Sequence, residues 1–326
     1  MEKIKTLPFS KWWPFLGGAL IGITMRLFFW HAPGNPYAAM MGSFIYLVPI
    51  LVGIVTVYIA ETQLRRSWGY YLWAPFLANV IFVVGTIVIL VEGWICAIVI
   101  IPLFAILGSF GGLLMGVVCR TTNWPKQTLY SFVALPLILG GFEVGLPLPE
   151  RISMIERQVT IHAPPSVVWQ QIHNARDIQA EEVSAGWAYR IGVPMPLAGV
   201  SQQSPSGMVR KITMGKGIHF DQVVVDWQEN QYVRWNYRFY DDSFPPHALD
   251  EHVRIGGMYF DFKDTAYKLT PQGKATVLTM RMHYRVSTQF NWYADRVARF
   301  LLGDVEAVVL DFYRHRSEIA AQSQAL

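Results

Sequence analysis

The sequence predicts a two-part fold: an all-α transmembrane bundle of about five spans, followed by an α+β domain with an antiparallel sheet and a long C-terminal helix. The bundle is indicated by residues 71–118, which contain one charged residue, Glu92. A single helix of that length would measure roughly 70 Å, whereas the apolar core of a bilayer is about 30 Å thick. The α+β domain is indicated by short runs beyond residue 150 in which apolar and polar residues alternate.

Length and charge place the division between the two parts near residue 150. The 326 residues suffice for two domains, which we expect at 1–149 and 150–326. The first 150 residues hold eight Lys or Arg and five Asp or Glu, and the remainder holds 19 and 18. No one-sided basic stretch stands out, which argues against nucleic acid as a partner. Both cysteines lie in the first part and no metal-binding spacing occurs, so neither a metal nor another cofactor is expected.

Five apolar runs are expected to cross the membrane, at 12–30, 38–60, 71–91, 94–118 and 129–148. The fifth is the weakest, because it contains prolines, glycines and Glu143, and a shallow re-entrant segment is its alternative. Arg26 lies about one turn from the end of the first run, where its long side chain can reach the interface. A functional charge inside the membrane is the alternative for Arg26. Glu92 and Gly93 are expected to form an aqueous turn between the third and fourth spans.

Loop charges predict the orientation of these spans. The N-terminal segment and the loops at 61–67 and 119–128 hold seven Lys or Arg, and the loops at 31–37 and 92–93 hold none. Positively charged loops face the cytoplasm, so the N-terminus is expected there. If the fifth run crosses fully, the C-terminal domain lies on the opposite side, which in a bacterial inner membrane is the periplasm. Four crossings would instead leave it in the cytoplasm.

Glycines spaced by four residues occur in two of the predicted spans. Gly108, Gly112 and Gly116 lie in the fourth run, and Gly18 and Gly22 lie in the first. This spacing allows two helix backbones to approach closely. Packing inside one bundle is the ordinary interpretation, and a homo-oligomer formed through the span at 94–118 is the alternative.

The second part is expected to contain one strand, two short helices, a series of strands and a final helix. Residues 155–161 alternate as a strand, Pro165 opens a first helix, and a second short helix is expected around 175–182. Residues 185–207 are rich in Gly, Pro and Ser, which predicts a long loop. The remaining strands are expected at 208–214, 218–228, 232–241, 257–269 and 275–287, and one amphipathic helix is expected at 291–320.

The entry into the first of these helices, Ile161-His-Ala-Pro-Pro-Ser-Val-Val-Trp169, resembles the START/Bet v 1-like (SRPBCC) superfamily, which includes polyketide cyclase/dehydrase and lipid-transport domains. Residues 304–318 resemble the terminal helix of that family, and the resemblance covers about residues 151–320. It implies a helix-grip fold, in which a curved antiparallel sheet wraps around the long helix with an apolar cavity between them. A shared fold does not fix the chemistry.

Strand alternation and the final helix assign a lining to the implied cavity. The expected ligand-binding residues are Trp235, Tyr237, Phe239, Leu278, Met280, Met282, Tyr284 and Phe300. Flexible thioethers beside aromatic rings suit a surface that accommodates varied apolar ligands. A filled core made of the same side chains is the alternative.

No catalytic set emerges from the sequence. His219, His252 and His283 fall among the strands and could act as general bases, but there is no nucleophile elbow, phosphate loop or carboxylate pair. The first hypothesis is a membrane-anchored module that takes up a lipid or another apolar small molecule at the bilayer surface. The alternatives are a membrane-tethered cyclase or dehydratase-like enzyme acting on a lipophilic substrate, and a structural interaction domain with a filled core.

Overall fold

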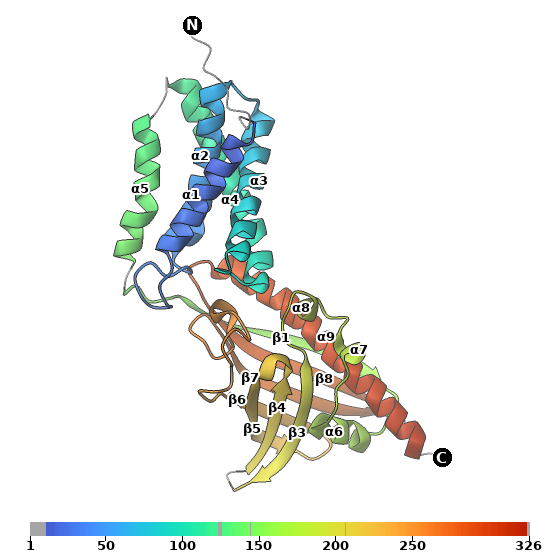
Figure 1. The fold of residues 1–326 in the computed structure, drawn as a ribbon. Helices are drawn as coiled ribbons and strands as arrows, with labels where there is room; N and C mark the ends of the chain where they lie inside the picture. Colours follow the sequence, from blue (N-terminus) through green and yellow to red (C-terminus); the bar gives the residue numbers. More distant parts are fainter. Residues whose placement is uncertain (1–10, 123–125, 144, 206, 325–326) are drawn as a thin grey trace. The chain divides into compact units, whose positions relative to one another are not determined.

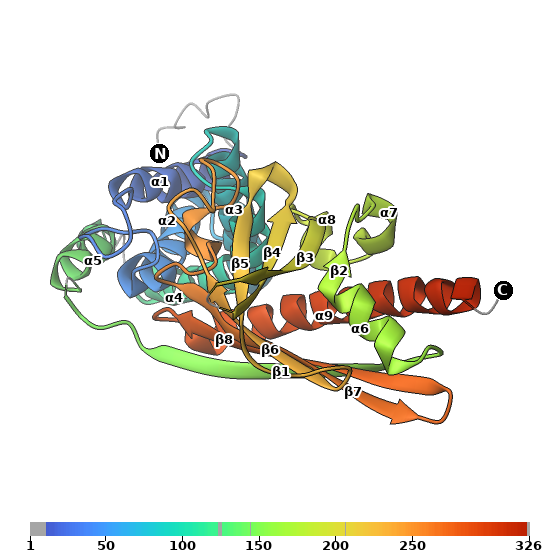
Figure 2. The same cartoon turned by 90° about the horizontal axis from the view of Figure 1, so that it is seen from below.

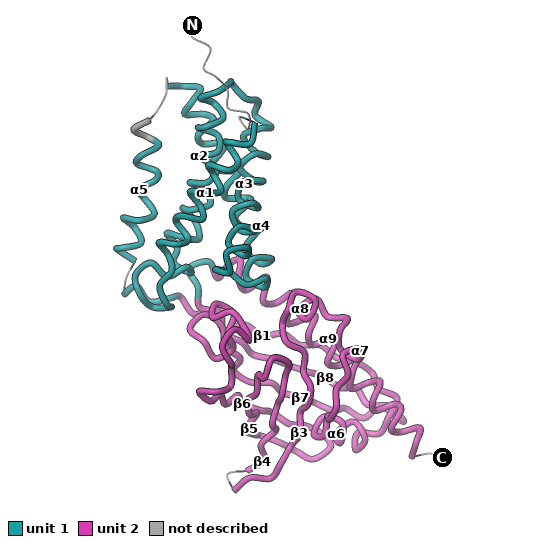
Figure 3. Tube along the Cα trace, viewed as in Figure 1, with its two compact units in different colours: residues 1–148, 288–290 teal, residues 149–287, 291–326 magenta. Residues whose placement is uncertain are grey.

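The chain divides into two compact units, residues 1–148 with 288–290 and residues 149–287 with 291–326 (Figure 3). A computed structural model describes residues 11–122, 126–143, 145–205 and 207–324. Lys3 and Lys5, which contribute to the N-terminal charge, therefore lie outside the described residues. The first unit is helical, and the second contains the sheet.

The helices of the first unit follow one another along the chain with short connections. They are α1 (Trp13–Phe28), a π-helical segment (Ser43–Leu47), α2 (Val48–Gln63), α3 (Trp68–Val88), α4 (Trp94–Thr121) and α5 (Lys126–Phe142). The π-helical segment continues directly into α2, so Pro49, which has no N–H to donate, lies inside one continuous helical run from Ser43 to Gln63.

Among the described residues, three helices are long and apolar enough to cross a membrane, rather than the expected five. They are Ser43–Gln63, Trp68–Val88 and Trp94–Thr121. The other two expected spans form shorter apolar helices, Trp13–Phe28 and Leu129–Phe142. A helix of 16 residues, the length of α1, is about 24 Å long, which is less than the roughly 30 Å core of a bilayer.

Arg26 and Glu92 form an ion pair, which corrects the expectation that each would reach water separately. Arg26 Nε donates to Glu92 Oε1 at 2.6 Å, and Nη1 donates to the carbonyl of Phe29 at 2.7 Å. Both side chains are largely buried. An isolated charge in apolar surroundings is costly, and a partner of opposite sign offsets much of that cost.

The regularly spaced glycines contact neighbouring helices inside the bundle. A Cβ added to Gly108 would collide with Asn79 of α3, and one added to Gly112 would collide with Pro75 of α3. In α1, a Cβ on Gly22 would lie 2.6 Å from the ring of Phe82. The glycine face of α4 is thus filled by packing within this unit.

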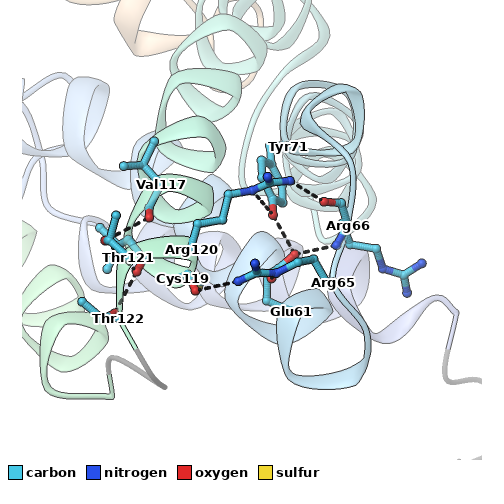
Figure 4. A network of polar contacts seen from close by, with 10 residues as sticks. Glu61, Arg65, Arg66, Tyr71, Val117, Cys119, Arg120, Thr121 and Thr122 are labelled. Carbon is cyan, nitrogen blue, oxygen red and sulfur yellow. Dashed lines mark hydrogen bonds and ion pairs between the residues drawn. The ribbon is translucent and has the colours of Figure 1, made fainter.

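A polar network joins the α2–α3 connection to the end of α4 (Figure 4). The Glu61 carboxylate accepts a hydrogen bond from the Tyr71 hydroxyl at 2.8 Å and another from the backbone N–H of Arg66 at 2.7 Å. Arg120 donates to the carbonyl of Arg66 at 3.0 Å and to the Tyr71 hydroxyl at 3.3 Å. The arginines of these two connections therefore gather at one end of the bundle.

The second unit contains eight strands and several helices. Its elements are β1 (Glu150–Ile161), α6 (Pro165–His173), β2 (Asn174–Ala175), α7 (Ala180–Val183), α8 (Trp187–Arg190), β3 (Pro196–Ser204), β4 (Gly207–Met214), a 3₁₀ turn (Gly215–Gly217), β5 (His219–Gln228), β6 (Tyr232–Arg238), a second 3₁₀ turn (Glu251–Val253), β7 (Phe260–Gln272), β8 (Ala275–Ser287) and α9 (Asn291–Gln324). Asn230 and Gly273, with φ of 59° and 61°, lie in the tight turns that join β5 to β6 and β7 to β8.

The strands form one antiparallel sheet in the order β1-β8-β7-β6-β5-β4-β3-β2. The sheet curls, and α9 packs against β1, β8 and the short helices α6 to α8 (Figures 1 and 2). An apolar core joins the inward side chains of the sheet to Leu310 and Phe312 of α9. A curled antiparallel sheet with a long C-terminal helix is the helix-grip arrangement, as the sequence predicted.

The segment 185–207, which was expected to be a loop, contains α8 and β3 instead. β3 begins at Pro196, a position at which a strand tolerates proline, and it pairs with β4. Gly199 of β3 lies beneath the side chain of Arg210, because a Cβ added there would be 2.6 Å from Arg210 Nη2. A glycine within a strand here marks a close approach rather than a loop.

Candidate functional site

A row of polar side chains crosses the inner face of the sheet. Ser201 of β3 pairs with Arg210 of β4, Arg210 pairs with Gln222 of β5, and Gln222 pairs with Tyr237 of β6. Directly opposite residues on antiparallel strands present their side chains to the same face. These four residues, the inner polar row, therefore form one line across four strands, on the side of the sheet that meets α9.

Arg210 is the centre of the inner polar row, and its side chain is 5% exposed. Nη1 donates to Gln222 Oε1 at 3.1 Å, and Nη2 donates to the Tyr313 hydroxyl of α9 at 2.6 Å. The guanidinium carbon lies 5.3 Å from the centroid of the Trp235 ring, a cation–π distance. These partners are neutral groups, so the row contains a buried positive charge.

Two nitrogen atoms beside this charge lack hydrogen-bond partners among the described residues. They are Arg210 Nε and Trp235 Nε1, and the Trp235 side chain is fully buried. Within the same described residues, no carboxylate lies within 4 Å of the Arg210 guanidinium nitrogens. Taking a charge out of water costs several kcal/mol unless an opposite charge and hydrogen bonds compensate.

His173, the last residue of α6, closes one end of the inner polar row. Its Nδ1 lies 2.8 Å from Ser201 Oγ, and its ring centroid lies 5.6 Å from that of Trp235. Burial, with a smaller contribution from the nearby Arg210 charge, lowers the pKa of His173 to about 4. The imidazole is therefore neutral at pH 7, and its Nε2 has no partner among the described residues.

Tyrosines enclose the other side of the inner polar row. The Tyr237 hydroxyl lies 2.5 Å from Thr265 Oγ1, and burial raises the pKa of Tyr237 to about 12. The Tyr267 ring packs against Trp235 and Tyr313, with centroid distances of 5.5 and 5.8 Å. Burial raises the pKa of Tyr267 as well, so the Tyr237 and Tyr267 hydroxyls stay protonated at neutral pH and the Arg210 charge remains the dominant charge of the row.

Most of the predicted lining residues lie on the inner face. Trp235, Leu278, Met280, Met282 and Tyr284 are buried in one apolar cluster of this unit. The structure thus brings these five together beside the inner polar row.

The other two predicted sheet residues belong to a neighbouring cluster. Tyr237 and Phe239 are partly buried and pack against Phe220, with ring centroids 5.7 and 5.5 Å from it. Tyr237 therefore contributes to both groups, because its hydroxyl end joins the inner polar row.

Phe300 does not belong to this surface, which corrects the prediction for α9. Its side chain is 61% exposed. The buried stripe of α9 instead contains Leu302, Glu306, Leu310 and Tyr313. Apolar periodicity alone does not define this stripe, because the side of α9 that faces the sheet includes an acidic residue.

Glu306 lies on that stripe with no exposed surface, and its two carboxylate oxygens have no hydrogen-bond partner among the described residues. Burial raises the pKa of Glu306 to about 8, while the charge of Arg157 opposes the shift. The side chain is therefore mostly a neutral acid at pH 7.

The histidines considered from the sequence lie outside the inner polar row. His283 is partly exposed, and its Nδ1 lies 3.0 Å from Asp264 Oδ1. His219 lies 3.4 Å from Asp242.

Arg210 and Gln222, at the centre of the row, were not among the site residues predicted from the sequence. A signal was present, however, because Arg210 occupies an inward position between Met208 and Ile212 of an alternating strand. Gln222 interrupts the inward positions of the next strand in the same way.

No protein-family model and no curated protein matches this sequence. Solved structures to which the chain is similar include a START superfamily protein from Mycobacterium smegmatis, with 14% identity and a TM-score of 0.33, covering 51% of this chain and 98% of that one. A norcoclaurine synthase point mutant from Thalictrum flavum has 9% identity and a TM-score of 0.32, covering 53% and 98%. The di-domain ARO/CYC BexL from the BE-7585A biosynthetic pathway has 13% identity and a TM-score of 0.32, covering 64% and 61%.

Proposed function

We propose that the protein is a membrane-anchored binding module whose helix-grip unit takes up a lipid or another apolar small molecule at the bilayer surface. The observation that carries the proposal is the inner face of the sheet. There an apolar wall, formed by Trp235, Leu278, Met280, Met282 and Tyr284, adjoins the buried N–H groups Arg210 Nε and Trp235 Nε1, which lack partners among the described residues. Each buried polar group without a hydrogen-bond partner costs about 1–3 kcal/mol of stability. In a core that binds no ligand, nothing would offset this cost. A ligand with an apolar body and a polar end would cover the wall and satisfy the N–H groups.

The titratable groups of this region favour binding over catalysis. A general acid or base works best when its pKa lies near the operating pH. The pKa values of His173, about 4, and of Tyr237, about 12, lie far from neutrality. Glu306, with a pKa of about 8, is the one of these groups on which a tethered cyclase or dehydratase-like enzyme would depend.

The membrane anchor is supported by the three apolar helices α2, α3 and α4. Three crossings, like the five predicted from the sequence, are an odd number, so either count places the C-terminal unit on the side opposite the N-terminus. The loop charges favour five crossings over three, because without a crossing by α1 the N-terminal lysines and the basic loop at 61–67 would lie on opposite sides of the membrane. With five crossings, all seven basic residues and the N-terminus lie in the cytoplasm.

We expect that a reporter active only in the cytoplasm is inactive when it is fused after Leu326 and active when it is fused before Met1. Measuring both fusions in the same bacterial host checks the assignment. Activity of both fusions would mean an even number of crossings and would contradict the proposed topology.

We expect Met282→Ala to weaken binding of an apolar probe by the full chain, because the Met282 side chain lies on the proposed ligand-facing wall. A palmitoyl analogue that carries a photoreactive diazirine can be cross-linked to the detergent-solubilised protein and located by peptide mass spectrometry. Met154→Ala is the matched control, since Met154 lies on β1 and is exposed.

The same variant separates a ligand-lining side chain from a plain core residue. Truncation of a core methionine costs on the order of 2–5 kcal/mol of stability. Met282→Ala with a large loss of melting temperature and unchanged labelling of inner-face peptides would favour the filled-core alternative.

A further inference from the structure

The strongest unassigned feature of the second unit is the environment of Arg210 and Trp235. Two buried N–H groups, Arg210 Nε and Trp235 Nε1, have no partner among the described residues, and the guanidinium carbon lies 5.3 Å from the centroid of the Trp235 ring. We propose that the ligand is an amphiphile with a single negative charge, of the long-chain carboxylate class, whose head group binds Arg210 and Trp235. This inference rests on the proposed binding function and specifies the chemistry of its ligand.

The hydrogen-bonding chemistry of the two residues requires an acceptor. The indole N–H of tryptophan and the guanidinium N–H groups of arginine donate and cannot accept. A hydroxyl or an amide could satisfy one donor, whereas a carboxylate offers two oxygen atoms that can accept from both. Charge-assisted hydrogen bonds of this kind are roughly twice as strong as neutral ones.

The charge of the site points to one negative charge. Arg210 is buried, and the groups that contact it are neutral: Gln222, Tyr267, Tyr313 and Trp235. His173, the nearest titratable base, is held neutral. A carboxylate would balance the guanidinium one to one, whereas a phosphomonoester head group would carry additional charge with no second cation in the inner polar row.

The protein holds the guanidinium in place before any ligand arrives. Gly199 leaves the space beneath it, and a Cβ there would lie 2.6 Å from Nη2 and 3.0 Å from Nε. Gln222 and the Tyr313 hydroxyl fix the two terminal nitrogens, while Nε keeps no hydrogen-bond partner among the described residues. A donor that is already oriented loses less conformational freedom on binding, which favours affinity.

The apolar part of the ligand would extend from this head group along the methionine-rich wall of β8. Trp235 pairs with Thr265 of β7, which in turn pairs with Met282 of β8, so the three side chains follow one another across the inner face. A chain that starts at Trp235 therefore meets Met282 next, in the cluster that α9 covers.

The test uses the full chain in detergent and two photoreactive probes, a diazirine-labelled hexadecanoic acid and the alcohol of the same chain length. Labelling of peptides from β4, β6 and β8 is divided by labelling of α2 to α4, which corrects for partition into the micelle. We expect the acid to label the inner face at least about tenfold more than the alcohol, as charge-assisted hydrogen bonds predict. Equal labelling by both probes would overturn the inference and leave the proposed function standing, whereas no inner-face labelling by either would overturn both.

Two variants test the assignment to these residues. Trp235→Phe removes the indole N–H and keeps an aromatic ring, and Arg210→Gln removes the charge. Each is expected to lower labelling by the acid at least about fivefold and to leave labelling by the alcohol nearly unchanged. Trp227→Phe and Arg234→Gln, both at exposed positions of neighbouring strands, are the matched controls.

The comparison of the acid with the alcohol on the wild-type chain needs no variant, so it decides the question even if Arg210→Gln fails to fold. Folded Trp235→Phe and Arg210→Gln variants that bind the acid as well as the wild type would place the head group elsewhere and overturn the assignment.

Discussion

A chain that ends at Phe290 is expected to keep its helical first unit and to lose the second unit as a folded body. The missing α9 contributes Leu310, Phe312 and Tyr313 to the core of the second unit, and its loss would uncover Trp235 and Met282. The apolar patch so exposed is on the order of several hundred Å², which soluble surfaces rarely tolerate. Limited proteolysis of the full and truncated chains in the same detergent, with mass spectrometry of the fragments, measures the effect.

A pair of point variants tests the same contact without deletion. Leu310→Asp places a charge at a site that is 2% exposed and is expected to destabilise the unit by at least about 4 kcal/mol, because an ionised carboxylate there has no partner. Phe300→Asp, on the exposed side of the same helix, is expected to change stability by less than about 0.5 kcal/mol. Truncated chains with a protease-resistant, β-rich second unit, or equal effects of the two variants, would contradict the assigned role of α9.

Alternation along the strands was sufficient to predict the sheet and much of its inner face. Trp235, Leu278, Met280, Met282 and Tyr284 were assigned inward from a period of two residues, and all five are buried. Where one face of a strand is covered, a shift of one residue would turn each side chain to the wrong face, so the pattern is strongly constrained. β3, which lies next to the two-residue edge strand β2, escaped prediction because its proline, glycine and serine residues resemble those of a loop.

Polar residues in inward positions account for the other errors. Arg210 and Gln222 interrupt the apolar positions of β4 and β5, and Glu306 lies in the middle of the buried stripe of α9. Methods that look for apolar periodicity assign such polar residues to the surface, and on α9 the apolar pattern placed the exposed Phe300 inward. Local rules fail most often at functional or strained sites, and these failures lie close to the proposed ligand site.

The first unit shows a different limit of sequence reasoning. Apolar composition located all five helices, but it did not determine how long each one is. α5 ends at Phe142, before Pro147, and α1 ends at Phe28, so both are shorter than the apolar runs that contain them. The pairing of Arg26 with Glu92 could not be derived either, because the two residues are brought together only by the packing of the bundle.

Glu306→Gln is expected to remove a pH dependence from the stability of the second unit. The pKa of Glu306 is raised to about 8 in the folded protein, chiefly by burial, against an ordinary value of 4.5. Between these two values the folded state holds a proton that the unfolded state has released, so stability is full below pH 4.5 and is lost as the pH rises through about 8. Glutamine has a similar size and does not ionise, so the variant should lack this loss.

Thermal unfolding of the full chain, followed by circular dichroism in one detergent from pH 5 to pH 9, measures the difference. At pH 5 we expect the melting temperatures of Glu306→Gln and the wild type to agree within about 2 °C, because both side chains are neutral. At pH 9 the variant should be more stable by roughly 1–3 kcal/mol, since the wild type then buries a carboxylate without partners. Glu229→Gln, at an exposed turn, should follow the wild type throughout. Parallel pH curves for Glu306→Gln and the wild type would mean that Glu306 is ionised and compensated in the folded protein, which would contradict its assignment as a buried neutral acid facing the sheet.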